Sequence, residues 1–248
     1  MIDAALVIEG GAMRGVYTSG VLDVFMKNNM FFAYIVAASS GALNAANYVA
    51  KHKGRSARIN LLHSKDRRFF GISQLIRSRG NYFNFDYLYH KPVNELYPYN
   101  YKALEETEQK FIITATNCIT AEPIYFIRHQ YDKMTEALTA SSSIPLVSKI
   151  AIVDGVPCLD GAVSAPIGIH KAIEDGNKKI VVVLTRDYDF MNKDIPAYIK
   201  VLMSIVYRRY PALTKKLINM PKNVFCKMEI PGIVKKIPHY CNKKSPKL

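Results

Sequence analysis

The sequence contains few cysteines, and they lie far apart. Cys118, Cys158, Cys226 and Cys241 include no CxxC pair among the 248 residues. Zinc sites and disulfide frameworks usually show closely spaced cysteines, so neither is expected here. We expect four reduced thiols, with no metal and no other cofactor.

The features of a targeting or membrane-spanning segment are also absent. The first residues, MIDAALVIEGG, carry an acid at position 3 and no basic residue, so we expect no signal peptide. Residues 28–50 are uncharged, but their asparagine and serine side chains would be costly inside a bilayer. We interpret this segment as a buried strand and helix. The expected location is cytoplasmic, with peripheral contact at the inner membrane face as one option.

Negative charge is scarce relative to positive charge, and the excess is concentrated. The net charge is +14; residues 51–79 hold nine Lys and Arg against one acid, and residues 207–248 hold eleven against one. Such segments suit either an anionic membrane surface or a solvated face. No helix-turn-helix, zinc-finger or RNP-type signature is present, so nucleic acid is not expected. We expect contact with anionic membranes through residues 207–248.

The order of the expected elements predicts an α/β fold, because short apolar runs alternate with helical patterns. The predicted strands are residues 4–9, 31–38, 110–118 and 178–185, with two more around an Asp-Gly turn in residues 149–161. The predicted helices are residues 16–28, 42–52, 131–143 and 166–176, the last with Pro166 in its first turn. We expect one domain over residues 1–190 and a basic, largely helical extension over residues 191–248.

The stretch IVAASSGALNA, residues 35–45, has the pattern of a nucleophile elbow. In such an elbow a serine follows a strand and precedes a helix, and the positions two before and two after it are small. Around Ser39 these positions are Ala37 and Gly41. Around Ser40 the glycine falls in the wrong place, so Ser39 is the better candidate. The pattern alone is weak, because a buried serine at a tight turn is common.

The first loop, GGAMRG from Gly10 to Gly15, can supply backbone amides to a developing oxyanion. A parallel crossover would bring this loop and the turn at Ser39 to one edge of the sheet. Phosphate binding in a dinucleotide fold is the rival interpretation, since only Ala12 departs from GxGxxG. No acid ends the second strand to bind a ribose, which favours the oxyanion.

A serine nucleophile also needs a base. The order Ser39, Asp160, His239 would fit an α/β-hydrolase triad, but only one strand precedes the strand that carries Ser39. His239 and His170 are more typical of surface or packing histidines. Asp160 ends a strand and precedes Gly161, so we expect it at the same sheet edge as Ser39, where it could take the proton directly.

Several segments together resemble the patatin-like phospholipase family, in its bacterial branch. They are LVIEGGAMRGVYTSGVLD, VAASSGALNAANY, YFNFDYLY, TATNC, ASSSIPL, LDGAVSAPI and IVVVLTRD, spread over residues 4–187. The resemblance implies a three-layer sandwich with a mostly parallel central sheet and a Ser-Asp dyad that hydrolyses lipid acyl esters. The family pattern usually has glycine where this chain has Ala12 and Ala37.

Carried over position by position, the resemblance makes Ser39 the nucleophile and Asp160 its base. The implied oxyanion donors are Gly10, Gly11 and Ala12. The implied supporting residues are Arg14, Gly15, Ala37, Gly41 and Gly161.

We therefore expect a serine hydrolase of lipid esters or phospholipids. A catalytically weak lipid-binding or interaction protein with the same fold is the alternative, and a nucleotide-binding oxidoreductase is a third possibility. The tyrosine-rich residues 82–101 could line an acyl pocket, touch a membrane or simply pack under a loop. Serines 141–143 are expected to cap backbone near the site.

Overall fold

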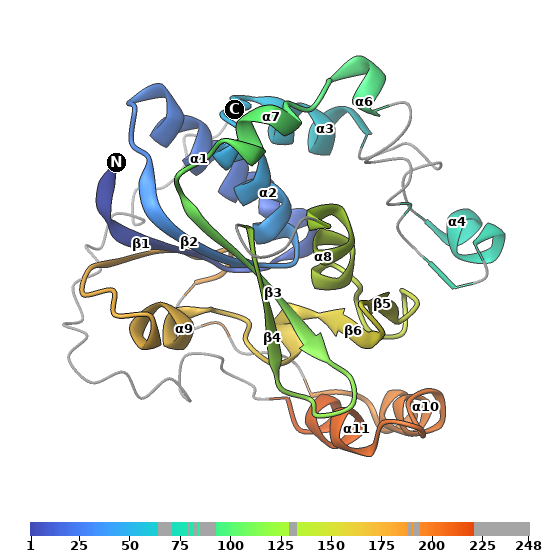
Figure 1. Cartoon of the computed structure of the whole chain (residues 1–248). Coiled ribbons are helices and arrows are strands. Elements are labelled where there is room, and N and C mark those ends of the chain that lie inside the picture. Colours follow the sequence, from blue (N-terminus) through green and yellow to red (C-terminus); the bar gives the residue numbers. More distant parts are fainter. Residues whose placement is uncertain are drawn as a thin grey trace, which may run out of the picture.

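The computed structural model places a single sheet between two layers of helices (Figure 1). The structure describes residues 1–63, 71–78, 80–81, 84, 93–128, 133–187, 190 and 194–220. Much of the tyrosine-rich segment and the whole of residues 221–248 lie outside these ranges. The predictions made for them, His239 included, are therefore untested.

The strands of the described residues are β1 (Ile2–Ile8), β2 (Phe32–Ala38), β3 (Lys110–Asn117), β4 (Pro123–Ile127), β5 (Ala151–Val153), β6 (Val156–Asp160) and β7 (Ile180–Val183). The α-helices are α1 (Gly15–Lys27), α2 (Ser40–Val49), α3 (Arg55–His63), α4 (Ile72–Arg77), α6 (Val93–Leu96), α7 (Tyr101–Glu105), α8 (Met134–Ser141), α9 (Ile169–Glu174), α10 (Ala197–Val206) and α11 (Pro211–Ile218). Two short 3-10 helices, η1 (Ala12–Arg14) and η3 (Gly161–Val163), flank the candidate site.

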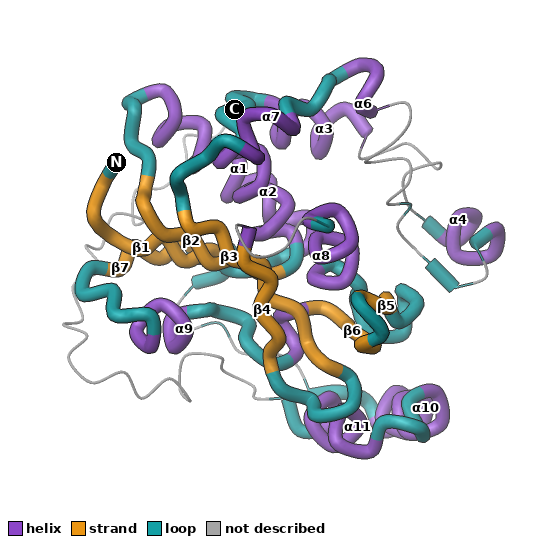
Figure 2. The backbone as a smooth tube through the Cα atoms, in the orientation of Figure 1, coloured by secondary structure: helices purple, strands orange, loops and turns teal. Residues whose placement is uncertain are grey.

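The sheet has the order β5-β6-β3-β2-β1-β7, with β4 paired to β3. The strands β7, β1, β2 and β3 run parallel, whereas β4, β5 and β6 are antiparallel to their neighbours. In Figures 1 and 2, α1, α2 and α8 cover one face of this sheet and α9 covers the other. The predicted α/β class with a mostly parallel central sheet is confirmed.

The apolar sequence of β2 follows from burial on both faces. Ile35 and Ala37 pack with the α1, α2 and α8 layer, while Tyr34 and Val36 pack with α9. Parallel strands covered by helices on both sides read as continuous apolar runs, which is why the sequence identified this strand.

The structure differs from the predicted elements at β4 and at α9. Strand β4 was not predicted, although it pairs with β3 over Ile112 to Thr116. The helix expected over residues 166–176 begins only at Ile169, after Gly168. Pro166 therefore precedes the helix instead of standing in its first turn. Gly168, directly before the helix, packs closely on β2, since a Cβ there would lie 2.8 Å from a methyl group of Val36.

The strands β2 and β6 meet end to end along one side of β3. Ile112 pairs with β2 and β4, and Ala115 pairs with β4 and β6, so β4 occupies one side of β3 while β2 and β6 share the other. Because β2 is parallel to β3 and β6 is antiparallel to it, the carboxyl ends of β2 and β6 point toward each other. The residues that follow these two strands are therefore forced together.

The hairpin formed by α10 and α11 packs against this end of the sheet. Its buried residues are Met203, Tyr207, Leu213 and Leu217, which cluster with Cys118, Ala121, Leu159 and Val163. The hydroxyl of Tyr207 also accepts a 2.7 Å hydrogen bond from the backbone amide of Leu146. In Figure 1 both helices lie beside the end of the β3–β4 hairpin. The division of the chain near residue 190 stays a prediction. No helix in the described ranges is long and apolar enough to cross a membrane.

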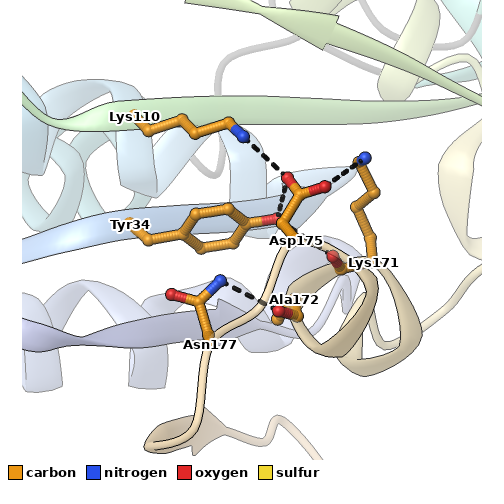
Figure 3. A network of polar contacts seen from close by, with 6 residues as sticks. All are labelled: Tyr34, Lys110, Lys171, Ala172, Asp175 and Asn177. Atoms are coloured by element: carbon orange, nitrogen blue, oxygen red, sulfur yellow. Dashed lines mark hydrogen bonds and ion pairs between the residues drawn. The ribbon is translucent and has the colours of Figure 1, made fainter.

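A polar network fastens α9 to the sheet at the other end of the strands (Figure 3). The carboxylate of Asp175 accepts hydrogen bonds from Lys171, Lys110 and Tyr34, at 2.6, 2.8 and 3.0 Å. Burial alone would raise the pKa of Asp175, but these three hydrogen bonds outweigh it and lower the pKa to about 2. The same carboxylate, with burial, raises the pKa of Tyr34.

We expect Asp175→Asn to destabilise the protein by about 1–2 kcal/mol at neutral pH, because the amide loses the charge that the two lysines and the tyrosine surround. A carboxylate with a lowered pKa contributes stability above about pH 4, and this is lost as the pH falls toward 2. The difference between wild type and variant in urea unfolding should shrink over that window. The control is Glu106→Gln, which removes an exposed ion pair with Lys102 and should cost nothing measurable. An equal loss in both variants would contradict the assignment.

Candidate active site

Ser39 stands at the turn between β2 and α2 in a conformation that few side chains adopt. Its φ is 54° and its ψ is −133°, outside the regions that ordinary residues prefer. Close contacts leave room only for glycine at two positions around this turn. A Cβ on Gly41 would lie 2.7 Å from the carbonyl oxygen of Glu9, and a Cβ on Gly10 would lie 2.8 Å from Cβ of Ser39. Ala37 is fully packed in the core. This is the geometry expected of a nucleophile elbow.

The hydroxyl of Ser39 donates a 2.7 Å hydrogen bond to Oδ2 of Asp160. The side chains come from the two strand ends that meet on β3, and both residues are buried, with 5% and 4% of their surface exposed. We had expected Asp160 at the same sheet edge because its strand ends there. The cause is different, since β6 is antiparallel and reaches Ser39 by meeting β2 head on.

Asp160 is held by its surroundings on all sides. Its Oδ1 accepts a 2.8 Å hydrogen bond from the amide of Ala162, and its own amide donates to the carbonyl of Ser143 at 2.9 Å. Thr116 donates from its hydroxyl to the carbonyl oxygen of Asp160 at 2.8 Å. These contacts fix the position and orientation of the carboxylate.

Burial is the largest influence on the pKa of Asp160 and raises it to about 6, although the hydrogen bonds from Ser39 and Ala162 act in the opposite direction. A buried carboxylate is disfavoured in its charged form because it has lost its hydration. A pKa near the operating pH suits a group that must both accept and return a proton.

The last residue of α8, Ser141, holds the backbone of this centre. The hydroxyl of Ser141 donates to the carbonyl of Thr114 at 2.6 Å and accepts a hydrogen bond from the amide of Ser39 at 2.8 Å. It therefore ties the strained turn to β3. The sequence suggested a capping role for serines 141–143, and the structure agrees for Ser141.

The Gly10–Gly15 loop lies directly against the turn, but its amides differ in their partners. The amide of Gly11 donates to the hydroxyl of Ser40 at 2.9 Å, whereas those of Gly10 and Ala12 have no hydrogen-bond partner among the described residues. Ala12 has a φ of 48°, in the left-handed region that favours glycine. The amide of Arg14 donates to the carbonyl of Gly11 at 3.0 Å, which closes the loop, and Gly15 packs closely on Ser40.

Sequence reasoning missed the buried carboxylate that anchors this loop. Glu9 accepts hydrogen bonds from the amide and hydroxyl of Thr185 at 2.6 and 3.0 Å, and the same hydroxyl reaches the carbonyl of Gly10 at 3.1 Å. Glu9 thus joins the loop to the end of β7. The available signal was an acid directly after an apolar strand, since such an acid is rarely buried without partners.

The histidines considered as bases lie elsewhere or outside the described ranges. His170 is exposed on α9, and the hydroxyl of Ser39 is engaged by a carboxylate. Among the residues that the structure describes, no group of histidine, cysteine or acidic side chains could hold a metal ion.

A cavity of about 470 Å³ opens next to the turn, within the usual range for ligand pockets. It is lined from five sides by α2, α3, α7, α8 and the segment before α7. Its apolar lining includes Leu43, Ala46, Ile59, Leu104, Met134 and Leu138. Ser40 and Asn44 form the side nearest to Ser39, and Tyr99 and Tyr101 lie at another side. The expectation that tyrosines line a pocket is met for these two.

We expect Gly161→Ala to lower both stability and activity strongly, because a Cβ there would collide with the carbonyl oxygen of Thr114 and push Asp160 out of place. The matched control is Gly20→Ala in α1, where a Cβ meets nothing within 4 Å. Alanine in a helix should stabilise that variant by about 0.5–1 kcal/mol and leave activity unchanged. Thermal unfolding and ester hydrolysis of both variants measure these effects. A Gly161→Ala variant with wild-type unfolding temperature and wild-type hydrolysis would contradict the close contact between Gly161 and Thr114.

A curated protein and a solved structure are similar to this chain. YjjU of Escherichia coli strain K12, described as an uncharacterized protein, is 30% identical over 187 residues, which are 73% of this chain and 51% of YjjU. The chain thus spans about half the length of that relative. The crystal structure of VipD from Legionella pneumophila is 10% identical, with a TM-score of 0.46 over 64% of this chain and 46% of VipD.

A family model also matches most of the chain. The model for patatin-like phospholipases covers residues 6–173, which include the Gly10–Gly15 loop, the turn at Ser39 and the strand that ends at Asp160. More than half of the chain is therefore covered, and the chain belongs to the patatin-like phospholipase family.

Proposed function

We propose that this protein is a serine hydrolase that cleaves acyl esters of lipids, with Ser39 as nucleophile and Asp160 as base. The family supports lipid acyl hydrolysis in general. The observation that carries the residue assignment is the 2.7 Å hydrogen bond between the Ser39 hydroxyl and Asp160 in a buried, strained turn.

In the first step Oγ of Ser39 attacks the ester carbonyl carbon while Oδ2 of Asp160 accepts the hydroxyl proton. The tetrahedral intermediate collapses, and the bond between the carbonyl carbon and the alcohol oxygen breaks. Asp160 returns its proton to that oxygen. The alcohol or lysolipid leaves, and the acyl group stays esterified to Ser39.

In the second step a water molecule gives a proton to Asp160 and attacks the acyl carbon. The bond from that carbon to Oγ of Ser39 breaks, and Oγ takes the proton back from Asp160. The fatty acid is released and the resting state is restored. Asp160 alone serves as proton acceptor and donor in both halves, which its pKa of about 6 suits.

The oxyanion of each intermediate is proposed to bind the amides of the glycine loop. The amides of Gly10 and Ala12 have no internal partner among the described residues, and Gly10 packs against Ser39, so these amides are free to donate. The amide of Gly11 must first leave the hydroxyl of Ser40. The start of α2 adds the positive end of a helix dipole at the same place.

The cavity beside α2 is proposed to hold the acyl chain. Its apolar lining lies on the side of the turn occupied by Ser40 and Asn44, and the chain of a bound acyl group could extend between α3 and α8. This places the ester at Ser39 and the hydrocarbon out of water. The peripheral contact of residues 207–248 with a membrane and the cytoplasmic location stay predictions.

The alternative is a catalytically weak lipid-binding protein with this fold. Two observations favour it: the hydroxyl of Ser40 already occupies the amide of Gly11, and Ala12 holds a left-handed conformation without being glycine. A fluorophosphonate probe separates the two functions, because it labels only an activated serine.

We expect Ser39→Ala to lower the hydrolysis of lipid esters by at least about 1,000-fold, since the nucleophile is removed. Asp160→Asn should lower it by about 100-fold or more, because an amide cannot accept the proton. The control is His170→Ala, an exposed site on α9 that should leave turnover unchanged. An ester panel from short-chain nitrophenyl esters to phospholipids measures all four proteins. Full turnover in purified Ser39→Ala would refute the assignment.

The acid limb of the pH profile should report Asp160. Its carboxyl must be ionised to act as base, so kcat/KM should fall with a slope of one below about pH 6. The charged form of Asp160 is buried in the folded protein, and this costs stability at any pH above the pKa that this carboxyl has in the unfolded chain. Asp160→Asn removes the charge, so its unfolding temperature at pH 8 should be no lower than that of wild type. A profile that stays flat down to pH 4.5 would contradict the role of this carboxylate.

A larger side chain in the cavity should shorten the preferred acyl chain. Thr135 is half-buried in the cavity wall on α8, so Thr135→Phe should reduce kcat/KM for long-chain esters at least about 10-fold relative to short-chain esters. Glu136→Phe changes an exposed position on the same helix and should leave the ratio unaltered. Equal ratios in both variants would place the acyl chain elsewhere.

A further inference from the structure

The helix α10 carries two apolar stripes, and only one of them is covered. Ile199, Met203 and Tyr207 recur at every fourth position and pack on the body of the protein. The other stripe follows the spacing i, i+3, i+4, i+7, i+8 and faces outward. We call it the outer stripe; its residues are Tyr198, Val201, Leu202, Ile205 and Val206.

The outer stripe is unusually exposed for its composition. Tyr198 is 72% exposed, Ile205 is 62% exposed and Val201 is 59% exposed. A contiguous row of five large apolar side chains is more than the scattered apolar residues of an ordinary surface, and such patches mark sites of interaction. The described part of the chain provides no cover for it.

The charge around the outer stripe indicates what kind of surface it meets. Residues 195–220 contain no acid and five basic residues, which are Lys200, Arg208, Arg209, Lys215 and Lys216. Arg208 and Arg209 follow α10 directly and are exposed, and Lys215 is exposed on α11. Apolar side chains flanked by basic ones, with a tyrosine among them, are typical of helices that lie in the interface of an anionic bilayer.

A second copy of the chain fits this surface less well. A symmetric dimer through the outer stripe would bring the exposed Arg208 and Arg209 of two hairpins together, and like charges across an interface are costly. A membrane with anionic headgroups supplies the opposite charge.

The hairpin is also firmly attached to the candidate site. Tyr207 fixes the loop after the three serines through its hydrogen bond with Leu146, and Val163, three residues after Asp160, packs in the same cluster as Met203 and Tyr207. A surface bound through α10 is therefore held in a constant position relative to Ser39 and Asp160.

We propose that the outer stripe inserts into the surface of an anionic phospholipid bilayer, with α10 lying in the plane of the interface and the exposed Arg208 and Arg209 facing the headgroups. Ten helical residues extend about 15 Å, which is too short to cross a bilayer. This binding is independent of the hydrolase activity and would hold even if Ser39 were inert.

The test is flotation of the full chain with vesicles of phosphatidylcholine alone or with 30% phosphatidylglycerol. Wild type should bind the anionic vesicles, and less in high salt. Val201→Asp/Ile205→Asp should reduce binding at least about 10-fold, because two charges enter the apolar stripe. Arg208→Gln/Arg209→Gln should reduce binding to anionic vesicles several-fold and weaken its salt dependence.

The matched control is Val24→Asp/Ile152→Asp, which places the same charges on two other exposed apolar residues and should bind as wild type does. All variants should keep the wild-type unfolding temperature and the wild-type turnover of a soluble short-chain ester. If the wild-type protein hydrolyses no ester, the hydrolase assignment fails, while the flotation results still test membrane binding. Unchanged binding in Val201→Asp/Ile205→Asp would overturn the proposal. So would a wild type that binds no vesicle but forms a dimer that this variant abolishes.

Discussion

The meeting of two strand ends on β3 is the constraint on which this molecule depends. β2 and β6 approach from opposite directions along one side of the same strand, and the chain must turn sharply where they meet. The turn after β2 carries Ser39 in a strained conformation, and Asp160 ends β6 within hydrogen-bonding distance. The strain is maintained because three parts of the structure contact this turn: β3, Ser141 at the end of α8, and the Gly10–Gly15 loop.

Burial sets the electrostatics of this centre. A carboxylate with little access to water keeps a proton more readily, and the two hydrogen bonds that Asp160 accepts limit the effect. Asp175 shows the opposite balance at the far end of the sheet, where two lysines and a tyrosine outweigh burial. The first carboxylate is suited to exchanging protons, and the second is suited to staying charged and holding α9 in place.

The elements that the sequence identified were those with strong local signals. β2 and α2 were found because an apolar run and an alanine-rich run are separated by a tight turn, and the Asp-Gly turn located β5 and β6. β4 was missed although its sequence, PIYFI, is apolar, and its place in the sheet depends on its pairing with β3. The start of α9 was misplaced because Pro166 is a common first-turn residue, whereas in the structure Gly168 packs on Val36 and the helix begins after it. Glu9 was missed because its partner Thr185 is 176 residues away.

The sequence by itself determined the fold class, the small residues around Ser39 and the candidacy of Asp160, because each depends on local pattern and motif order. Only the tertiary structure decided that these two side chains meet, since a strand register, not a residue type, brings them together. It also decided that Gly11 donates to Ser40, and that α10 packs one apolar stripe inward and leaves the other exposed. A sequence shows that a helix is apolar, but burial depends on which neighbours the fold provides.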